Sequence, residues 1–205
     1  MKSVRTRRPV RAATGIALLS LACVISLVVL VLGLRKDLGS VPTLPLLLYG
    51  VACLTSFAGQ LAAALIPPPG EVLPSGHRSS RMSLVSLAIT VPIGVVLGIR
   101  AHSGGPWDPE HLSHFWAHAV PCLLNGLAVA AVPALLGVRA LRRLVPRGSW
   151  RTALAVGGAC GVLAGLGLEL HCPRYDLAHV ALAHGSVMVL PALLLALLGI
   201  RLLAD

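Results

Sequence analysis

A short polar turn, residues 169–176 (Glu-Leu-His-Cys-Pro-Arg-Tyr-Asp), separates two long apolar runs near the end of the chain. In this turn Cys172 directly follows His171 and comes three residues after Glu169. Thiolate and imidazole are ligands that suit zinc and copper in proteins, and a thiol can also be oxidised. The turn therefore predicts metal or redox chemistry.

A second polar segment spans residues 101–117, and within it Asp-Pro-Glu at residues 108–110 is typical of a helix start. Beyond it, three histidines and a cysteine are spaced three, four and four residues apart: His111, His114, His118 and Cys122. At 3.6 residues per turn these side chains share one helix face. Pro121 removes a backbone hydrogen bond and bends this helix just before Cys122.

Seven of the eight histidines fall at the same end of the expected helices as this turn: His102, His111, His114, His118, His171, His179 and His184. They predict a zinc or copper site with Glu169 as a ligand or as an orienting partner. The other side chains of this predicted site are Cys122, Cys172, His118, His171 and His179. In the alternative interpretation, these histidines fill a membrane interface and hydrogen-bond water or loop carbonyls.

The five cysteines divide by their expected depth in a membrane. Cys23, Cys53 and Cys160 lie within apolar segments, where cysteine behaves as a small hydrophobic residue. Cys122 and Cys172 lie at the outer ends of expected helices, where an oxidising exterior allows a disulfide. Basic neighbours would instead favour a reactive thiolate or metal binding. The residues leave disulfide and metal open as alternatives.

The elements that must position these residues are membrane helices. Of the 205 residues, 56% are hydrophobic and 12% are charged, and the mean hydropathy is +0.86. We predict an all-α integral membrane bundle, because backbone groups in lipid need internal hydrogen bonds. Six apolar segments have the length, about 20 residues, that crosses a bilayer core: residues 12–34, 46–67, 83–100, 119–138, 152–169 and 178–201.

Proline and glycine mark two further features of this bundle. Residues 67–70, Pro-Pro-Pro-Gly, end the second span and predict an irregular loop as far as Arg81. The fifth span is rich in small residues, which permit close helix contact within or between chains. Its glycines include Gly157, Gly158, Gly161 and Gly165.

The net charge is +10, and the basic residues are distributed in a way that indicates the orientation of the chain in the membrane. Thirteen of the 17 lysines and arginines fall on one side of the six spans, and the other side carries Arg35, Lys36, Arg100 and Arg174. Both termini are therefore predicted in the cytoplasm, and the turn at 169–176 faces outward. Residues 1–11 form a short basic cytoplasmic arm, residues 12–205 form the transmembrane domain, and the first span is a retained signal-anchor.

Three motifs resemble the NrsF-type anti-sigma-F membrane proteins. Residues 33–38, Gly-Leu-Arg-Lys-Asp-Leu, are similar to that family's G-x-R-x-D-L signature after its first helix. Pro-Cys-Leu at 121–123 and His-Cys-Pro at 171–173 are also similar. The resemblance implies an inner-membrane protein that retains an extracytoplasmic-function sigma factor until an envelope signal, such as heavy-metal or oxidative stress, releases it. It also implies a sensing role for Cys122 and Cys172.

Members of that family carry a longer cytoplasmic segment before the first helix than the eleven residues found here. Capture of the sigma factor is therefore assigned to the short arm, to the loop at 68–82 or to the loop at 139–151. The last of these loops contains Arg142, Arg143 and Arg147. In the alternative interpretation these arginines serve membrane topology and bind anionic lipid.

Two other classes of function are compatible with the same sequence. A small membrane carrier or binding protein for a metal ion or another small solute would use the outer histidines to receive its cargo. A structural membrane subunit would need no stimulus. No catalytic motif occurs, no acidic residue lies at the middle of a span, and the basic residues are accounted for without nucleic acid.

Overall fold

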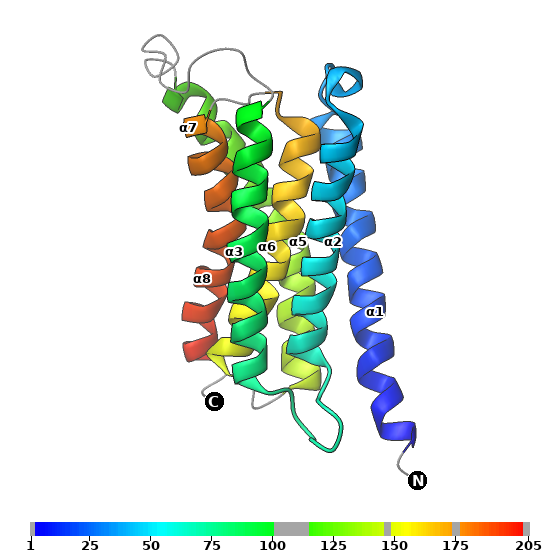
Figure 1. The fold of residues 1–205 in the computed structure, drawn as a ribbon. Helices are drawn as coiled ribbons and strands as arrows, with labels where there is room; N and C mark the ends of the chain where they lie inside the picture. The colour runs from blue at the N-terminus through cyan, green and yellow to red at the C-terminus, as the bar shows by residue number, and fades with distance from the viewer. Residues whose placement is uncertain (1–2, 101–114, 146–148, 174–176, 203–205) are drawn as a thin grey trace.

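The computed structural model describes residues 3–100, 115–145, 149–173 and 177–202. Within these ranges all the regular structure is helical, which confirms the predicted all-α class. Six helices are long and apolar enough to cross a membrane: Pro9–Leu32, Thr43–Leu65, Gly76–Val96, Phe115–Leu144, Trp150–His171 and Val180–Gly199. They run side by side along one axis, and the start of the first and the end of the last lie at the same end of the bundle (Figure 1).

The first half of the chain contributes α1 (Ser3–Ser26) with its π-helical continuation η1 (Leu27–Leu32), a single 3-10 turn η2 (Leu38–Ser40), α2 (Thr43–Leu65) and α3 (Gly76–Arg100). The second half contributes α5 (Phe115–Leu144), α6 (Trp150–His171), the short α7 (Leu177–His179), the π-helix η3 (Val180–His184) and α8 (Gly185–Leu202). Because α1 begins at Ser3, it includes most of the predicted arm.

The predicted irregular loop before the third span was wrong in its second half. Ile66 and the three prolines after it end α2 as expected, but α3 begins at Gly76, so Arg78 and Arg81 lie on its first turns. The hydroxyl of Ser79 donates to the carbonyl oxygen of Ala63 at 2.9 Å. This bond ties the start of α3 to α2 and supports the helix where the polar sequence predicted none.

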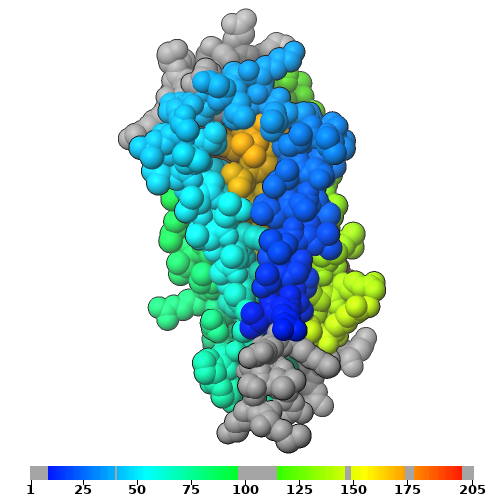
Figure 2. Space-filling model, turned by 90° about the vertical axis from the view of Figure 1, so that its right-hand side faces the viewer, coloured from blue at the N-terminus to red at the C-terminus, as the bar shows by residue number. Residues whose placement is uncertain are grey.

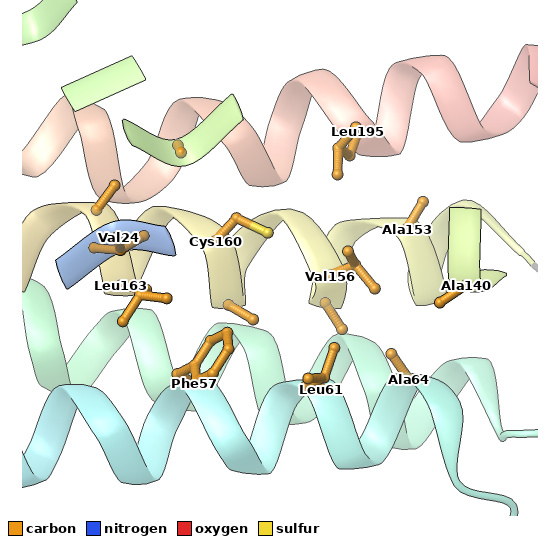
Figure 3. Close-up of a cluster of buried hydrophobic side chains, with 14 of the residues drawn as sticks. Val24, Phe57, Leu61, Ala64, Ala140, Ala153, Val156, Cys160, Leu163 and Leu195 are labelled. Atoms are coloured by element: carbon orange, nitrogen blue, oxygen red, sulfur yellow. The ribbon is translucent and has the colours of Figure 1, made fainter. Parts of the chain in front are cut away.

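Helix α6 is the centre of the bundle. In an 18-residue stretch of its span 83% of the residues are buried, against 17% to 56% in the corresponding stretches of the other five spans. Figure 3 shows α6 between α2 and α8, with Val156 and Leu163 directed toward Leu61 and Phe57 of α2. A displacement of α6 would therefore change the packing of several neighbouring helices at once.

Two glycines bring the backbones of α6 and α8 into contact. A methyl group added at Gly157 would lie 2.2 Å from the carbonyl oxygen of Pro191, and one added at Gly161 would lie 2.2 Å from that of Met188. Small residues allow such close approach between membrane helices. The sequence left open contact within or between chains, and at these two positions the contact is within the chain.

Large apolar side chains cover the outside of the bundle. Leu18, Leu30, Leu47 and Leu135, from three different helices, are each at least 60% exposed. So many exposed large apolar side chains are unusual for a water-soluble monomer, and they suit contact with lipid tails. Figure 2 views the face formed by α1 and α2, between which the last part of α6 is visible.

Candidate functional site

The candidate site lies where α5 begins and α6 ends, at the end of the bundle away from the start of α1 (Figure 1). Cys122 lies in the second turn of α5, and Cys172 follows the last residue of α6. The backbone N–H of Cys172 donates to the carbonyl oxygen of Leu168 at 2.7 Å and so closes the last turn of α6. Two helix ends thus hold the two predicted cysteines.

The two cysteines meet although 50 residues separate them in the chain. Their sulfur atoms lie 3.2 Å apart, and the Cys172 sulfur lies 3.4 Å from Nε2 of His179. One donor atom from each of Cys122, Cys172, His179 and His184 falls within 4.8 Å of the other three. The cluster is enclosed by the protein. The exposed fractions of its side chains are 9% for Cys122, 3% for Cys172, 1% for His179 and 4% for His184.

The π-helix η3 explains why His179 and His184 meet. Residues five apart in an α-helix point about 140° away from each other, at 3.6 residues per turn. A π-helix has wider turns closed by bonds between residues five apart, and such turns occur often at functional sites. The N–H of Gly185 bonds to the carbonyl oxygen of Val180 in this way. The two imidazole rings consequently stand edge to face, with centroids 5.4 Å apart.

Glu169 lies beneath this cluster on the last turn of α6. Its carboxylate is buried, and Oε2 lies 3.4 Å from Nδ1 of His184. The sequence placed Glu169 near the cysteines as a ligand or an orienting partner, and the geometry favours the orienting position. His184 was counted among the outer histidines but was not in the predicted ligand set, and the structure brings it to the cluster.

The other two predicted ligands lie elsewhere. His118 is exposed on α5, one turn before Cys122 and on the far side of the bend that Pro121 predicts. His171 turns toward the end of the first span, where its Nδ1–H donates to the carbonyl oxygen of Gly33 at 2.9 Å. Neither residue belongs to the group of four donors found among the described residues. The predicted metal role of His118 and His171 receives no support from this geometry.

The G-x-R-x-D-L loop docks on the same end of α6. Gly33 adopts φ +81°, a backbone conformation that glycine tolerates best, and so turns the chain out of η1. The N–H of Arg35 then donates to the carbonyl oxygen of Leu170 at 3.0 Å. The buried guanidinium of Arg35 donates two hydrogen bonds to the carboxylate of Asp37, one from Nε to Oδ1 at 2.8 Å and one from Nη2 to Oδ2. The loop therefore ties the first span to the helix that ends at Cys172.

The Arg35 guanidinium holds the pKa of Asp37 below its ordinary value of 3.8. A carboxylate with a lowered pKa stabilises the fold above its unfolded pKa, and this contribution is lost as pH falls through the folded pKa. We expect Asp37→Asn to cost about 1 kcal/mol at pH 7, a modest value because water reaches this side chain. Thermal unfolding in detergent should show the gap to the unchanged chain closing below about pH 4. An unchanged gap at low pH would contradict this role.

The opposite end of the bundle carries basic side chains. Arg142 and Arg143 are exposed in the last turn of α5, while Arg147 lies outside the described residues. A groove of about 390 Å³ between α1 and α5 is lined by Arg139, Arg143 and apolar side chains. A second groove, of about 640 Å³, lies between α2 and α3. This end therefore offers cationic surfaces on two pairs of helices.

Comparison with protein families supports the resemblance seen in the sequence. A family model described as NrsF, negative regulator of sigma F, matches residues 1–204. The match includes the four clustered donors and the loop that carries Arg35 and Asp37. No curated protein and no solved structure matches the chain.

Proposed function

Because the chain belongs to the NrsF family of negative regulators of sigma F, we propose that it is an anti-sigma factor embedded in the bacterial cytoplasmic membrane. It retains an extracytoplasmic-function sigma factor at the cytoplasmic face. An envelope signal, either a thiophilic metal or an oxidant, acts on Cys122 and Cys172 and releases the sigma factor. The observation that carries this proposal is the 3.2 Å separation of two buried sulfur atoms from different helices.

Oxidation gives the simplest switch at this site. Hydrogen peroxide takes two electrons from the two thiols and the sulfurs join; the O–O bond breaks, and each peroxide OH group takes one thiol proton and leaves as water. The sulfur atoms then approach from 3.2 Å to the bonded distance of about 2.05 Å. This movement draws the end of α6 toward the start of α5. A metal ion bound between the same sulfurs would also fix their separation.

Helix α5 offers a direct route from this site to the other end of the bundle. It carries Cys122 near its start and Arg142 and Arg143 in its last turn. Those positions are about 30 Å apart at 1.5 Å per residue. A signal can release a partner only if the two packings of the bundle differ in affinity for it. We place the sigma factor against the basic end, where Arg142, Arg143 and Arg147 would pair with its acidic side chains.

The experiment is affinity purification of the full chain from membranes, once under reducing conditions and once after peroxide treatment, with identification of the proteins that co-purify. A sigma factor should be retained by the reduced chain and lost, by about tenfold or more, from the oxidised one, which corresponds to roughly 1.4 kcal/mol or more of differential binding. Thiol labelling should show Cys122 and Cys172 consumed together.

The Cys122→Ser variant is the control, because it should retain the sigma factor under both conditions. If no sigma factor accompanies the chain in either state, the proposal fails, and the metal or solute carrier becomes the better interpretation. Cellular metal content after deletion of the gene would then be the next measurement.

A further inference from the structure

We infer that Cys122, Cys172, His179 and His184 form a tetrahedral binding site for one Zn²⁺ ion. The role of this ion in signalling rests on the proposed function, but its binding does not. The four donors come from three places in the fold: α5, the end of α6, and the helical segment from α7 to η3. Folding alone therefore brings them together, as a structural zinc site requires.

The spacing of the donor atoms fits such an ion. Zinc bonds of about 2.3 Å to sulfur and 2.0 Å to nitrogen place tetrahedral ligands roughly 3.3 to 3.8 Å apart. The Cys122 and Cys172 sulfurs lie 3.2 Å apart, the Cys172 sulfur lies 3.4 Å from His179 Nε2, and all four donors fall within 4.8 Å. Side-chain shifts of about 1 Å or less would complete the tetrahedron.

His184 gives an independent indication of a ligand. It is 4% exposed, yet neither ring nitrogen makes a well-formed hydrogen bond with the described residues, and the Glu169 carboxylate lies at ion-pair distance only. Buried polar atoms normally form hydrogen bonds, so this imidazole needs an explanation. Glu169 lies 3.4 Å from Nδ1 of His184, on the side where an Nδ1–H would donate to a carboxylate. That arrangement leaves Nε2 as the metal ligand, as in the carboxylate–histidine–zinc pattern.

Charge and enclosure favour zinc over other ions. Two thiolates cancel the double charge of Zn²⁺, which reduces the cost of placing the ion in a site as enclosed as this one. Two sulfur and two imidazole ligands in a tetrahedron are typical of structural zinc, whereas calcium and magnesium require oxygen ligands. Four protein donors also fill the coordination shell of zinc, which is the mark of a structural site and not of a catalytic one.

Zinc would hold both sulfurs as thiolates, the form that reacts with oxidants and with softer metals. A disulfide cannot form between Cys122 and Cys172 while both sulfurs bind the ion. An oxidising or metal signal would therefore first have to displace zinc. The disulfide or the new metal bond that then joins the two sulfurs, and not the loss of zinc by itself, changes the packing of α5 against α6. The ion thus occupies the two sulfurs in the resting state of the proposed switch, and a chain that has neither zinc nor a disulfide still retains the sigma factor.

The test is the metal content of the full-length chain, purified from membranes in detergent with a phosphine reductant and metal-free buffers. We expect about one zinc per chain, as for a four-ligand structural site. Cys172→Ser and His184→Ala should reduce zinc to background, while His118→Ala, which changes an exposed histidine on the same helix as Cys122, should keep it. Glu169→Gln should weaken zinc binding about 10- to 100-fold, the effect of losing an orienting partner.

Reconstitution with Co²⁺ provides a second readout that does not depend on yield. The unchanged chain should show a thiolate-to-cobalt charge-transfer band and tetrahedral visible bands, both absent from His184→Ala protein that elutes as a monodisperse species. Zinc equal in His118→Ala and His184→Ala protein, no metal at all, or copper in place of zinc would each overturn the inference. Zinc bound by a chain that captures no sigma factor would support the site and reject the proposed function.

Discussion

Replacement of Cys172 by serine is expected to abolish the response to the envelope signal while the protein stays in the membrane. A serine hydroxyl cannot form a disulfide, and it is a poor ligand for thiophilic metals. Since Cys172 lies within 3.4 Å of both the Cys122 sulfur and His179, the substitution removes the centre of the cluster. The change in size is small, so the end of α6 should keep its structure.

The measurement is a reporter that depends on the sigma factor, followed with and without peroxide or a thiophilic metal. The unchanged chain should permit at least about tenfold induction, because release of a partner needs a corresponding difference in affinity. The Cys172→Ser chain should show the uninduced level throughout. Cys23→Ser is the matched control, because Cys23 lies near the end of α1, in the interior of the first span and outside the group of four donors, and its loss should leave induction intact.

Two outcomes would contradict the role of this thiol. Full induction in the Cys172→Ser strain would show that the signal enters elsewhere. Constant high reporter activity, with the variant chain still present in membranes, would show that Cys172 is needed for capture of the sigma factor and not for its release. Immunodetection in the membrane fraction separates both outcomes from simple loss of the protein.

The fold was largely predictable from composition. Every apolar run of about 20 residues became a helix, because backbone groups have no other way to satisfy their hydrogen bonds in lipid. Helix ends were less predictable. The polar, proline-rich stretch before Arg81 predicted a loop, yet the hydroxyl of Ser79 reaches Ala63 on α2 and supports a helix from Gly76. Such a tertiary contact leaves no periodic signal in the sequence.

The candidate site was predictable in part. Cys122, Cys172 and His179 were in the predicted set, because their types and their common end of the bundle indicated related chemistry. His184 was missed, since only a π-helix aligns it with His179, and no single-sequence pattern marks a π-helix. His171 lies outside the group of four donors for a related reason. Its ring binds the carbonyl oxygen of Gly33, a partner 138 residues away that spacing along one helix cannot reveal.

The second large effect is expected at Gly161, which is not one of the four donors. In Gly161→Val protein the new Cβ would lie 2.2 Å from the carbonyl oxygen of Met188 and 2.9 Å from that of Val187, and backbone atoms cannot rotate away as a side chain can. Helix α8 must therefore move off α6. Overpacking of this kind costs about 3 kcal/mol, a large part of the stability of most domains. Thermal unfolding in detergent, followed by the loss of monodisperse protein, measures the effect.

Gly50→Ala is the matched control, because Gly50 lies within α2 and an added methyl group there meets nothing within 4 Å. Alanine is the better helix former by about 1 kcal/mol, so this control should be as stable as the unchanged chain or slightly more stable. Equal stability of the Gly161→Val and Gly50→Ala proteins would mean that α6 and α8 do not pack through this glycine.

The Gly161→Val substitution should also affect the candidate zinc site, because α8 is continuous with the segment that carries one of the ligands. Helix α8 continues directly from η3, which carries His184, so a shift of α8 away from α6 also moves that imidazole away from Cys172. Gly161→Val should then lower zinc binding as well as stability, although it changes no ligand. Gly165→Ala should do less of both, because its neighbour is the flexible side chain of Met188 and not a backbone atom. A graded loss of zinc in this order would tie the metal site to the packing of the central helix.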